Sequence, residues 1–235
     1  MNRPNQADVD ALVAQLSSGQ FEAAVAAARR LTEAFPHIPL LHLLLATGLT
    51  QGGQLELAVQ TYREALALDP DYFDAFYNLG VVFRRQGRMS EAIESYLSAL
   101  KLQPQNLDAR RNLARIYDEF AAKRYHQVRL ADAAEFSAKA LALDGENLEL
   151  LGIAARIARA LGRADGEILK RMVAAPVRNW GDVTRRIWAG SMLGRPEEVY
   201  SFRIDGLARA AGRRAWDIST GAKAATGIRE WLKPT

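Results

Sequence analysis

The feature that most constrains this chain is a repeat of apolar, small and proline residues with a period of 34 residues. The clearest unit runs from Phe73 to Pro104, and its marked positions are Leu79, Gly80, Phe83, Gly87, Ala92, Tyr96, Ala99 and Leu102. One step of 34 residues toward the N-terminus falls on Leu45, Ala46, Leu49, Gly53, Ala58, Tyr62, Ala65, Leu68 and Pro70. A second step back falls on Gly19, Ala24, Leu31 and Pro36, and one step forward falls on Leu113, Ala114 and Tyr117. Such self-similarity predicts an array of stacked supersecondary units.

Each repeated position has a physical reason within a pair of helices. Apolar residues recur at three- and four-residue spacing, which is typical of amphipathic helices. Gly53 and Gly87 allow the left-handed backbone of a tight turn after the first helix. Ala92 lets the two helices approach closely, and Pro70 and Pro104 end the second helix because proline cannot continue it. One hairpin cannot cover its own apolar face, so hairpins are expected to stack.

This pattern resembles the tetratricopeptide repeat (TPR) family, most clearly over residues 37–104 and also over 5–36 and 105–145. The resemblance implies an all-α fold, a right-handed α-solenoid of helix-turn-helix repeats with a degenerate helical C-terminal cap. It also implies a protein that holds a partner protein or peptide in the concave groove that the first helices line.

We expect four hairpins over residues 1–145, a degenerate fifth over 146–176 and a Trp-rich helical cap over 177–235. In the fourth hairpin, Ala133 and Ala140 follow Ala92 and Ala99 by 41 residues rather than 34. The seven extra residues are about two helical turns, and we expect them to lengthen both helices by one turn each. All four tryptophans lie at 180, 188, 216 and 231, where we expect them to seal the last core, with an exposed docking patch as the alternative.

One face of each first helix is predicted to meet a ligand, because steps of three and four residues stay on one side of a helix. By resemblance to the TPR groove, the binding residues are Leu40, Leu43, Leu44, Thr47, Asp74, Tyr77, Asn78, Val81, Arg85, Asp108, Arg111, Asn112 and Arg115. Asn78 and Asn112 occupy the same position of successive repeats, and an asparagine can pair with both the N–H and the C=O of an extended peptide. The chain lacks the full set of Lys, Asn and Arg of the chaperone-binding TPR clamps, so a chaperone C-terminus is not expected.

Charge is distributed unevenly, and this leaves other functions open. Residues 1–104 carry a net charge of −3 and residues 105–235 carry +7. A basic half can attract acidic proteins or nucleic acid, so a nucleic-acid-binding helical solenoid is one alternative. A basic contact tip is the sharper interpretation of the fourth hairpin's end, at Lys123, Arg124, His126 and Arg129, and a solvated surface is the simpler one. Self-association through the Trp-rich end or the N-terminal edge is also left open.

No pattern in the sequence indicates catalysis, a metal or a cofactor. There is no cysteine, and His37, His42 and His126 do not have metal-ligand spacing. We therefore expect an adaptor or scaffold rather than an enzyme, without cofactors, in the cytoplasm and outside any membrane. The N-terminal repeats also resemble TPR segments of bacterial glycosyltransferases and sulfotransferases, so a regulatory subunit or fragment of a transferase complex is the second alternative.

Overall fold

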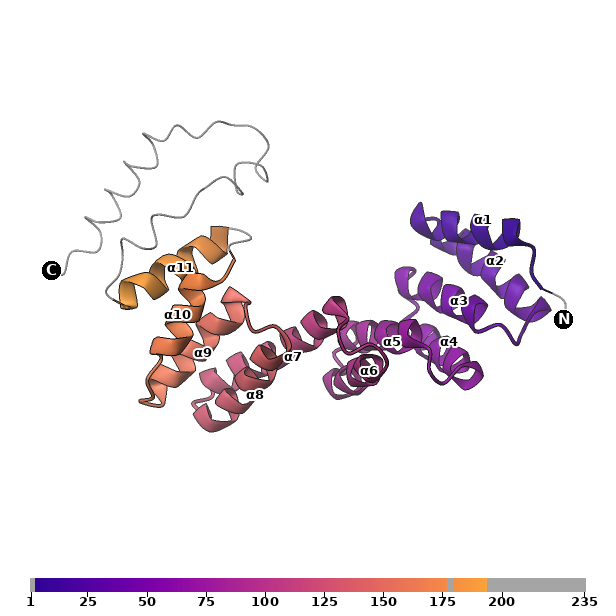
Figure 1. Cartoon of the computed structure of the whole chain (residues 1–235). Coiled ribbons are helices and arrows are strands. Elements are labelled where there is room, and N and C mark those ends of the chain that lie inside the picture. The colour runs from indigo at the N-terminus through magenta and orange to yellow at the C-terminus, as the bar shows by residue number, and fades with distance from the viewer. Residues whose placement is uncertain (1–2, 177–179, 194–235) are drawn as a thin grey trace, which may run out of the picture. The chain divides into compact units, whose positions relative to one another are not determined.

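The computed structural model describes residues 3–176 and 180–193, and every regular element in these ranges is a helix. The chain divides into two compact units, residues 1–116 and 117–235. Unit 1 contains α1 (Gln6–Ser17), α2 (Phe21–Ala34), α3 (Pro39–Gln51), α4 (Leu55–Leu68), α5 (Phe73–Arg85) and α6 (Met89–Leu102). Helix α7 (Leu107–His126) contains the boundary between the units. Unit 2 continues with α8 (Leu130–Leu143), α9 (Leu148–Ala160), α10 (Gly166–Ala174) and α11 (Trp180–Met192) (Figure 1).

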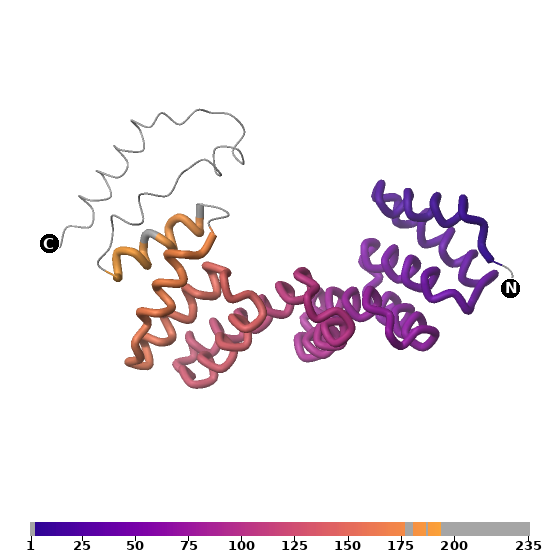
Figure 2. Tube along the Cα trace, viewed as in Figure 1, coloured from indigo at the N-terminus to yellow at the C-terminus, as the bar shows by residue number. Residues whose placement is uncertain are grey.

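Consecutive helices form hairpins whose turns share one backbone pattern. After α5, the N–H of Gly87 bonds to the Arg84 carbonyl and the N–H of Arg88 to the Phe83 carbonyl, and Gly87 has a φ of 74°. The equivalent bonds and a positive φ recur at Gly19, Gly53 and Gly162. This arrangement satisfies the last carbonyls of a helix and favours glycine. The helices of each hairpin in unit 1 lie side by side along the trace (Figure 2).

Small residues at the repeated positions let the paired helices pack closely. In unit 1, Ala58, Ala65, Ala92 and Ala99 are all fully buried. The rings of Tyr62 and Tyr96 are 1% and 0% exposed, so the repeated tyrosine position belongs to the core. Gly80 lies directly against Tyr96, because a Cβ atom built on Gly80 would come within 2.7 Å of the ring. The repeated alanine and tyrosine positions therefore belong to the cores of the hairpins.

The fourth hairpin absorbs its seven extra residues differently from the prediction. Helix α7 has 20 residues, whereas α3 and α5 have 13 each, and α8 has 14 residues like α4 and α6. The prediction that both helices would lengthen was therefore wrong. The turn explains the difference, because the N–H of Val128 bonds to the Tyr125 carbonyl and the N–H of Arg129 to the Arg124 carbonyl, as at Gly87. With the turn and α8 unchanged, the whole insertion lies in α7.

Unit 2 packs around two clusters of buried side chains. One cluster joins Ala121 of α7, Ala133 of α8 and Ile157 of α9. The other contains Leu148, Leu151, Ala155, Leu169, Met172, Ala175 and Ala189. Trp188 is half-buried and packs against the second cluster, in agreement with a sealing role for this tryptophan. The side chain of Trp180, and Trp216 and Trp231 as a whole, lie outside the described residues.

Candidate binding surfaces

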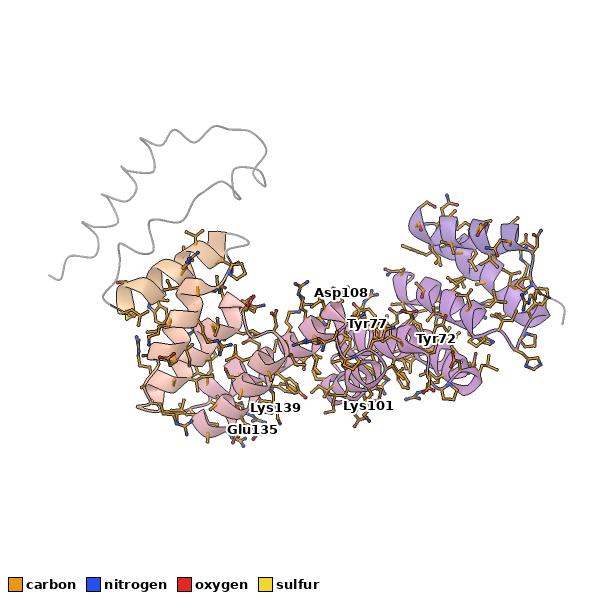
Figure 3. The ribbon with its side chains drawn as sticks, viewed as in Figure 1. Tyr72, Tyr77, Lys101, Asp108, Glu135 and Lys139 are labelled. Carbon is orange, nitrogen blue, oxygen red and sulfur yellow. The ribbon has the colours of Figure 1, made fainter. Side chains whose placement is uncertain are left out.

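The first-helix face of unit 1 is the surface that the predicted binding residues of α3, α5 and the N-terminal part of α7 share. Leu40 is 43% exposed, Asp74, Asp108 and Arg111 are exposed, and Asn78 is half-buried. Tyr77 and Asp108 lie on the side of this unit away from Lys101 of α6 (Figure 3). Leu44 and Val81 are also half-buried.

Leu43, Thr47 and Arg85 are among the predicted residues that are already used in packing or in contacts between repeats. Leu43 is only 9% exposed, so it offers little surface to a ligand. The Thr47 hydroxyl donates to the Leu43 carbonyl at 2.8 Å and lies 3.2 Å from the Tyr62 hydroxyl. Arg85 donates to the carbonyl of Thr50, in the last turn of α3, at 2.8 Å. Arg85 therefore links α5 to the preceding repeat.

The two asparagines at the repeated position have different surroundings. The Nδ2 of Asn112 donates to the Tyr77 hydroxyl at 3.0 Å, and its Oδ1 accepts from Arg115 at 3.4 Å. The Tyr77 ring lies 5.9 Å from the Tyr96 ring in an edge contact. Asn112 thereby holds α7 against α5. The Asn78 amide, in contrast, has no hydrogen-bond partner among the side chains that the structure describes.

A cavity in unit 2 was not predicted from the sequence. Its volume is about 360 Å³, and its lining comes from α9, α10 and α11, namely Glu149, Gly152, Ile153, Arg156, Met172, Thr184, Arg185 and Trp188. A 41-residue step from Asp108, Asn112 and Arg115 reaches Glu149, Ile153 and Arg156. The same 41-residue spacing relates Ala92 to Ala133. Continued to the first helix of the next hairpin, it would have indicated these three lining residues.

The charged residues that line this cavity are Glu149, Arg156 and Arg185, and they interact with carboxyl groups outside the lining. Arg185 lies 3.4 Å from the Glu149 carboxylate and 3.5 Å from that of Asp182, which are long distances for ion pairs. Burial first, and then the negative charge of Glu149, raise the pKa of Asp118 to about 6, although Arg156 and Arg185 act in the opposite direction. Asp118 on α7 is thus a half-buried carboxyl that lacks a close cation.

The predicted basic tip lies at the end of α7 and the start of the next turn. Lys123, His126 and Arg129 are exposed, whereas Arg124 is half-buried and donates to Gln127 at 3.2 Å. Arg129 also forms an ion pair with Asp132. Val128, in the turn just before Arg129, is 78% exposed and has a φ of 60°. This conformation costs energy for a β-branched residue.

Several other polar side chains form contacts within the protein. The Nε2 of His42 lies 2.9 Å from the Pro36 carbonyl, so that nitrogen carries the proton, and the Nδ1 faces Glu64 at 3.4 Å. On α8, Glu135 and Lys139 form an ion pair one helical turn apart (Figure 3).

No group of three or more His, Asp or Glu side chains in the described ranges could hold a metal ion. None of the described helices is long and apolar enough to cross a membrane.

Comparison with known proteins identifies the repeat. A family model described as "TPR repeat" matches residues 49–87, and one described as "Tetratricopeptide repeat" matches residues 73–106. A search of curated proteins found no match.

Solved structures share the fold. A crystal structure of MamA is 17% identical with a TM-score of 0.55, covering 81% of this chain and 93% of that one. PilF of Pseudomonas aeruginosa is 21% identical with a TM-score of 0.54, covering 87% of this chain and 90% of that one. A MamA structure from Desulfovibrio magneticus RS-1 is 18% identical with a TM-score of 0.53, covering 72% of this chain and 91% of that one. The family matches identify tetratricopeptide repeats within residues 49–106, and the solved structures show that the chain shares their helical-repeat fold.

Proposed function

We propose that this protein is a non-catalytic interaction module that binds a peptide or helix of a partner protein on the first-helix face of unit 1. The observation that carries the proposal is the set of polar groups that the fold leaves unused there. The Asn78 amide and the Arg111 guanidinium have no hydrogen bond or ion pair within the described residues, although the neighbouring Arg85 and Asn112 do. A partner can satisfy these groups without displacing an internal contact.

The chemistry of the face favours a segment with one apolar and one charged end. Leu40 and Leu44 present apolar surface on α3, whereas Asp108, Arg111 and Arg115 present charge on α7. Asn78 lies between them on α5 and can donate to one backbone group and accept from another. Arginine is well suited to a carboxylate, because its planar guanidinium donates two parallel hydrogen bonds.

Affinity capture from the native cell extract tests this proposal when it uses variants matched for chemistry. Asn78→Ala/Arg111→Ala removes an amide and a guanidinium, neither with an internal partner, from the first-helix face. Gln60→Ala/Arg63→Ala removes the same two groups from exposed positions of α4. Asn112 is left intact, because its contact with Tyr77 holds two helices together.

The full chain and the two double variants are used as baits, and the captured proteins are quantified by mass spectrometry. The proposal predicts that at least one protein is depleted with the first-helix-face variant and retained with the α4 variant. If both variants retain the same proteins in the same amounts, the first-helix face is not the binding surface.

A further inference from the structure

The turn between α7 and α8 has a valine at the position where the other described turns of this kind have glycine. Val128 has a φ of 60°. The same two backbone hydrogen bonds, with a φ between 67° and 78°, recur at Gly19, Gly53, Gly87 and Gly162. Glycine adopts this conformation without strain, whereas a β-branched residue does not. The geometry of the turn therefore gives no reason for a valine.

The side chain of Val128 contributes to neither buried cluster of unit 2. It is 78% exposed, more than any other large apolar side chain in the described ranges. Tyr125, three residues earlier, packs against one of the clusters, so the end of α7 is held in place beneath the valine. An exposed apolar residue in a strained conformation, without a core contact, points to a contact outside the chain.

The charges next to this valine favour an acidic partner. Lys123 is exposed and has no ion pair within the residues that the structure describes. Arg124 donates to the neutral amide of Gln127 at 3.2 Å. Arg129, in contrast, forms an ion pair with Asp132. In the described part of the chain, two cations of the last turn of α7 are therefore not matched by a carboxylate.

We propose that the tip of the fourth hairpin, residues 123–129, inserts Val128 into an apolar pocket of a partner protein that is bordered by carboxylates. Lys123 and Arg124 pair with those carboxylates, and burial of the valine side chain offsets the strain of its backbone. This surface lies in unit 2 and shares no residue with the first-helix face of unit 1. It goes beyond the function proposed above, because it adds a second contact with its own ligand chemistry.

Photocrosslinking from the tip tests the proposal. Benzoylphenylalanine replaces Gln127, which is exposed, and leaves Val128 in place. The same probe at the exposed Lys170 of α10 is the control position. The full chain is irradiated in the native cell extract, and tandem mass spectrometry locates the crosslinked segment of the partner. The proposal predicts a crosslink from position 127 and none from position 170, to a segment in which apolar residues adjoin aspartate or glutamate.

Variants of the tip separate binding from folding. Val128→Gly and Val128→Asn relieve the strain and remove the apolar side chain, whereas Val128→Ile keeps the strain and an apolar side chain. Lys123→Gln removes an exposed cation that has no ion pair in the described ranges, and Arg163→Gln makes the same change in the loop after α9 as its matched control. Each variant is titrated against the purified partner by fluorescence anisotropy, and its free energy of unfolding is measured in urea.

We expect Val128→Gly and Val128→Asn to bind the partner about tenfold more weakly, although both fold more stably than the native chain. Val128→Ile should retain binding. Lys123→Gln should weaken binding by up to about fivefold, and Arg163→Gln should leave it unchanged.

Binding by Val128→Gly at native strength would overturn the proposal, as would the absence of a crosslink specific to position 127. A crosslink to a second copy of this chain, or to a partner segment without carboxylates, would also contradict it. Capture that depends on Asn78 and Arg111 is measured separately, so failure of the tip leaves the function proposed for unit 1 standing, and the reverse also holds.

Discussion

Replacing Gly80 by alanine should destabilise unit 1, although alanine is the better helix former. Gly80 lies within α5 and is buried. An alanine Cβ there would lie 2.7, 2.8 and 2.9 Å from the Cε1, Cδ1 and Cζ atoms of Tyr96. Carbon atoms in contact are normally about 3.5–4.0 Å apart, so the ring must move by nearly 1 Å. Tyr96 is fully buried and lies against Tyr77, so the ring has little room to move.

The magnitude follows from two opposing effects. Alanine is favoured over glycine by about 1 kcal/mol in the interior of a helix. Adding volume to a well-packed core typically costs about 1–3 kcal/mol. Because the clash at Gly80 is with a buried aromatic ring, we expect the upper part of that range and a net loss of about 1–2 kcal/mol in the free energy of unfolding. At the preceding repeat an alanine, Ala46, already occupies this position, so the expected effect is specific to the Gly80–Tyr96 contact.

Gly152→Ala provides the matched control, since Gly152 also lies within a helix and its added Cβ would make only ordinary contacts at 3.8 and 3.9 Å. Urea unfolding followed by circular dichroism should show Gly80→Ala less stable and Gly152→Ala more stable than the native chain, the latter by about 1 kcal/mol. If Gly80→Ala gains as much stability as Gly152→Ala, the proposed close packing of Tyr96 on α5 is wrong.

Three further predictions concern other parts of the chain. Val128→Gly should raise the free energy of unfolding by about 0.5–1 kcal/mol, because glycine adopts the positive φ without strain and this gain outweighs its extra freedom in the unfolded chain. Urea titration measures the change, and a lower free energy of unfolding would show that Val128 is not strained. Asp118→Asn should stabilise the chain by about 1 kcal/mol at about pH 7.5, after allowance for partial exposure, and change little at about pH 4. The folded chain raises the pKa of this carboxyl to about 6 and so holds its proton more tightly than the unfolded chain, which makes stability fall as pH rises from about 4 to about 6. Thermal unfolding at both pH values checks the sign, and a gain confined to the acidic sample would contradict it. Tyr62→Phe should cost about 1 kcal/mol in the same assay, because the buried hydroxyl donates to Thr47; an unchanged midpoint would show that this bond contributes nothing.

The hairpins could be predicted from the sequence because the same physical constraints recur in every repeat. Gly87 marks the turn and Ala92 marks the close approach of helices, and both positions behave as expected. The location of the seven-residue insertion could not be predicted, because the period of 41 residues is satisfied equally by one longer helix or by two. The turn settles the question, since the backbone around Val128 keeps the geometry found at Gly87.

The candidate surfaces were less predictable, because helical spacing gives the face of a residue but not its partners. Asn78 and Asn112 share a repeat position, yet only Asn112 has a tyrosine within reach of its amide. Arg85 is predicted to meet a ligand, and helical spacing gave no sign that it also donates to the Thr50 carbonyl. The cavity beside Arg156 depends on the packing of α10 and α11 against α9, for which the sequence offers no clear repeat.

Site-specific photocrosslinking tests the central claim most directly, because it reports which surface a partner touches. Benzoylphenylalanine is placed at Val81 on the first-helix face or at Leu97 on α6, which is 42% exposed. Each full-length variant is irradiated in the native cell extract, and the crosslinked proteins are identified by mass spectrometry. We expect a partner protein to crosslink at position 81 and not at position 97. Crosslinks formed only at position 97, or equally at both positions, would contradict binding on the first-helix face.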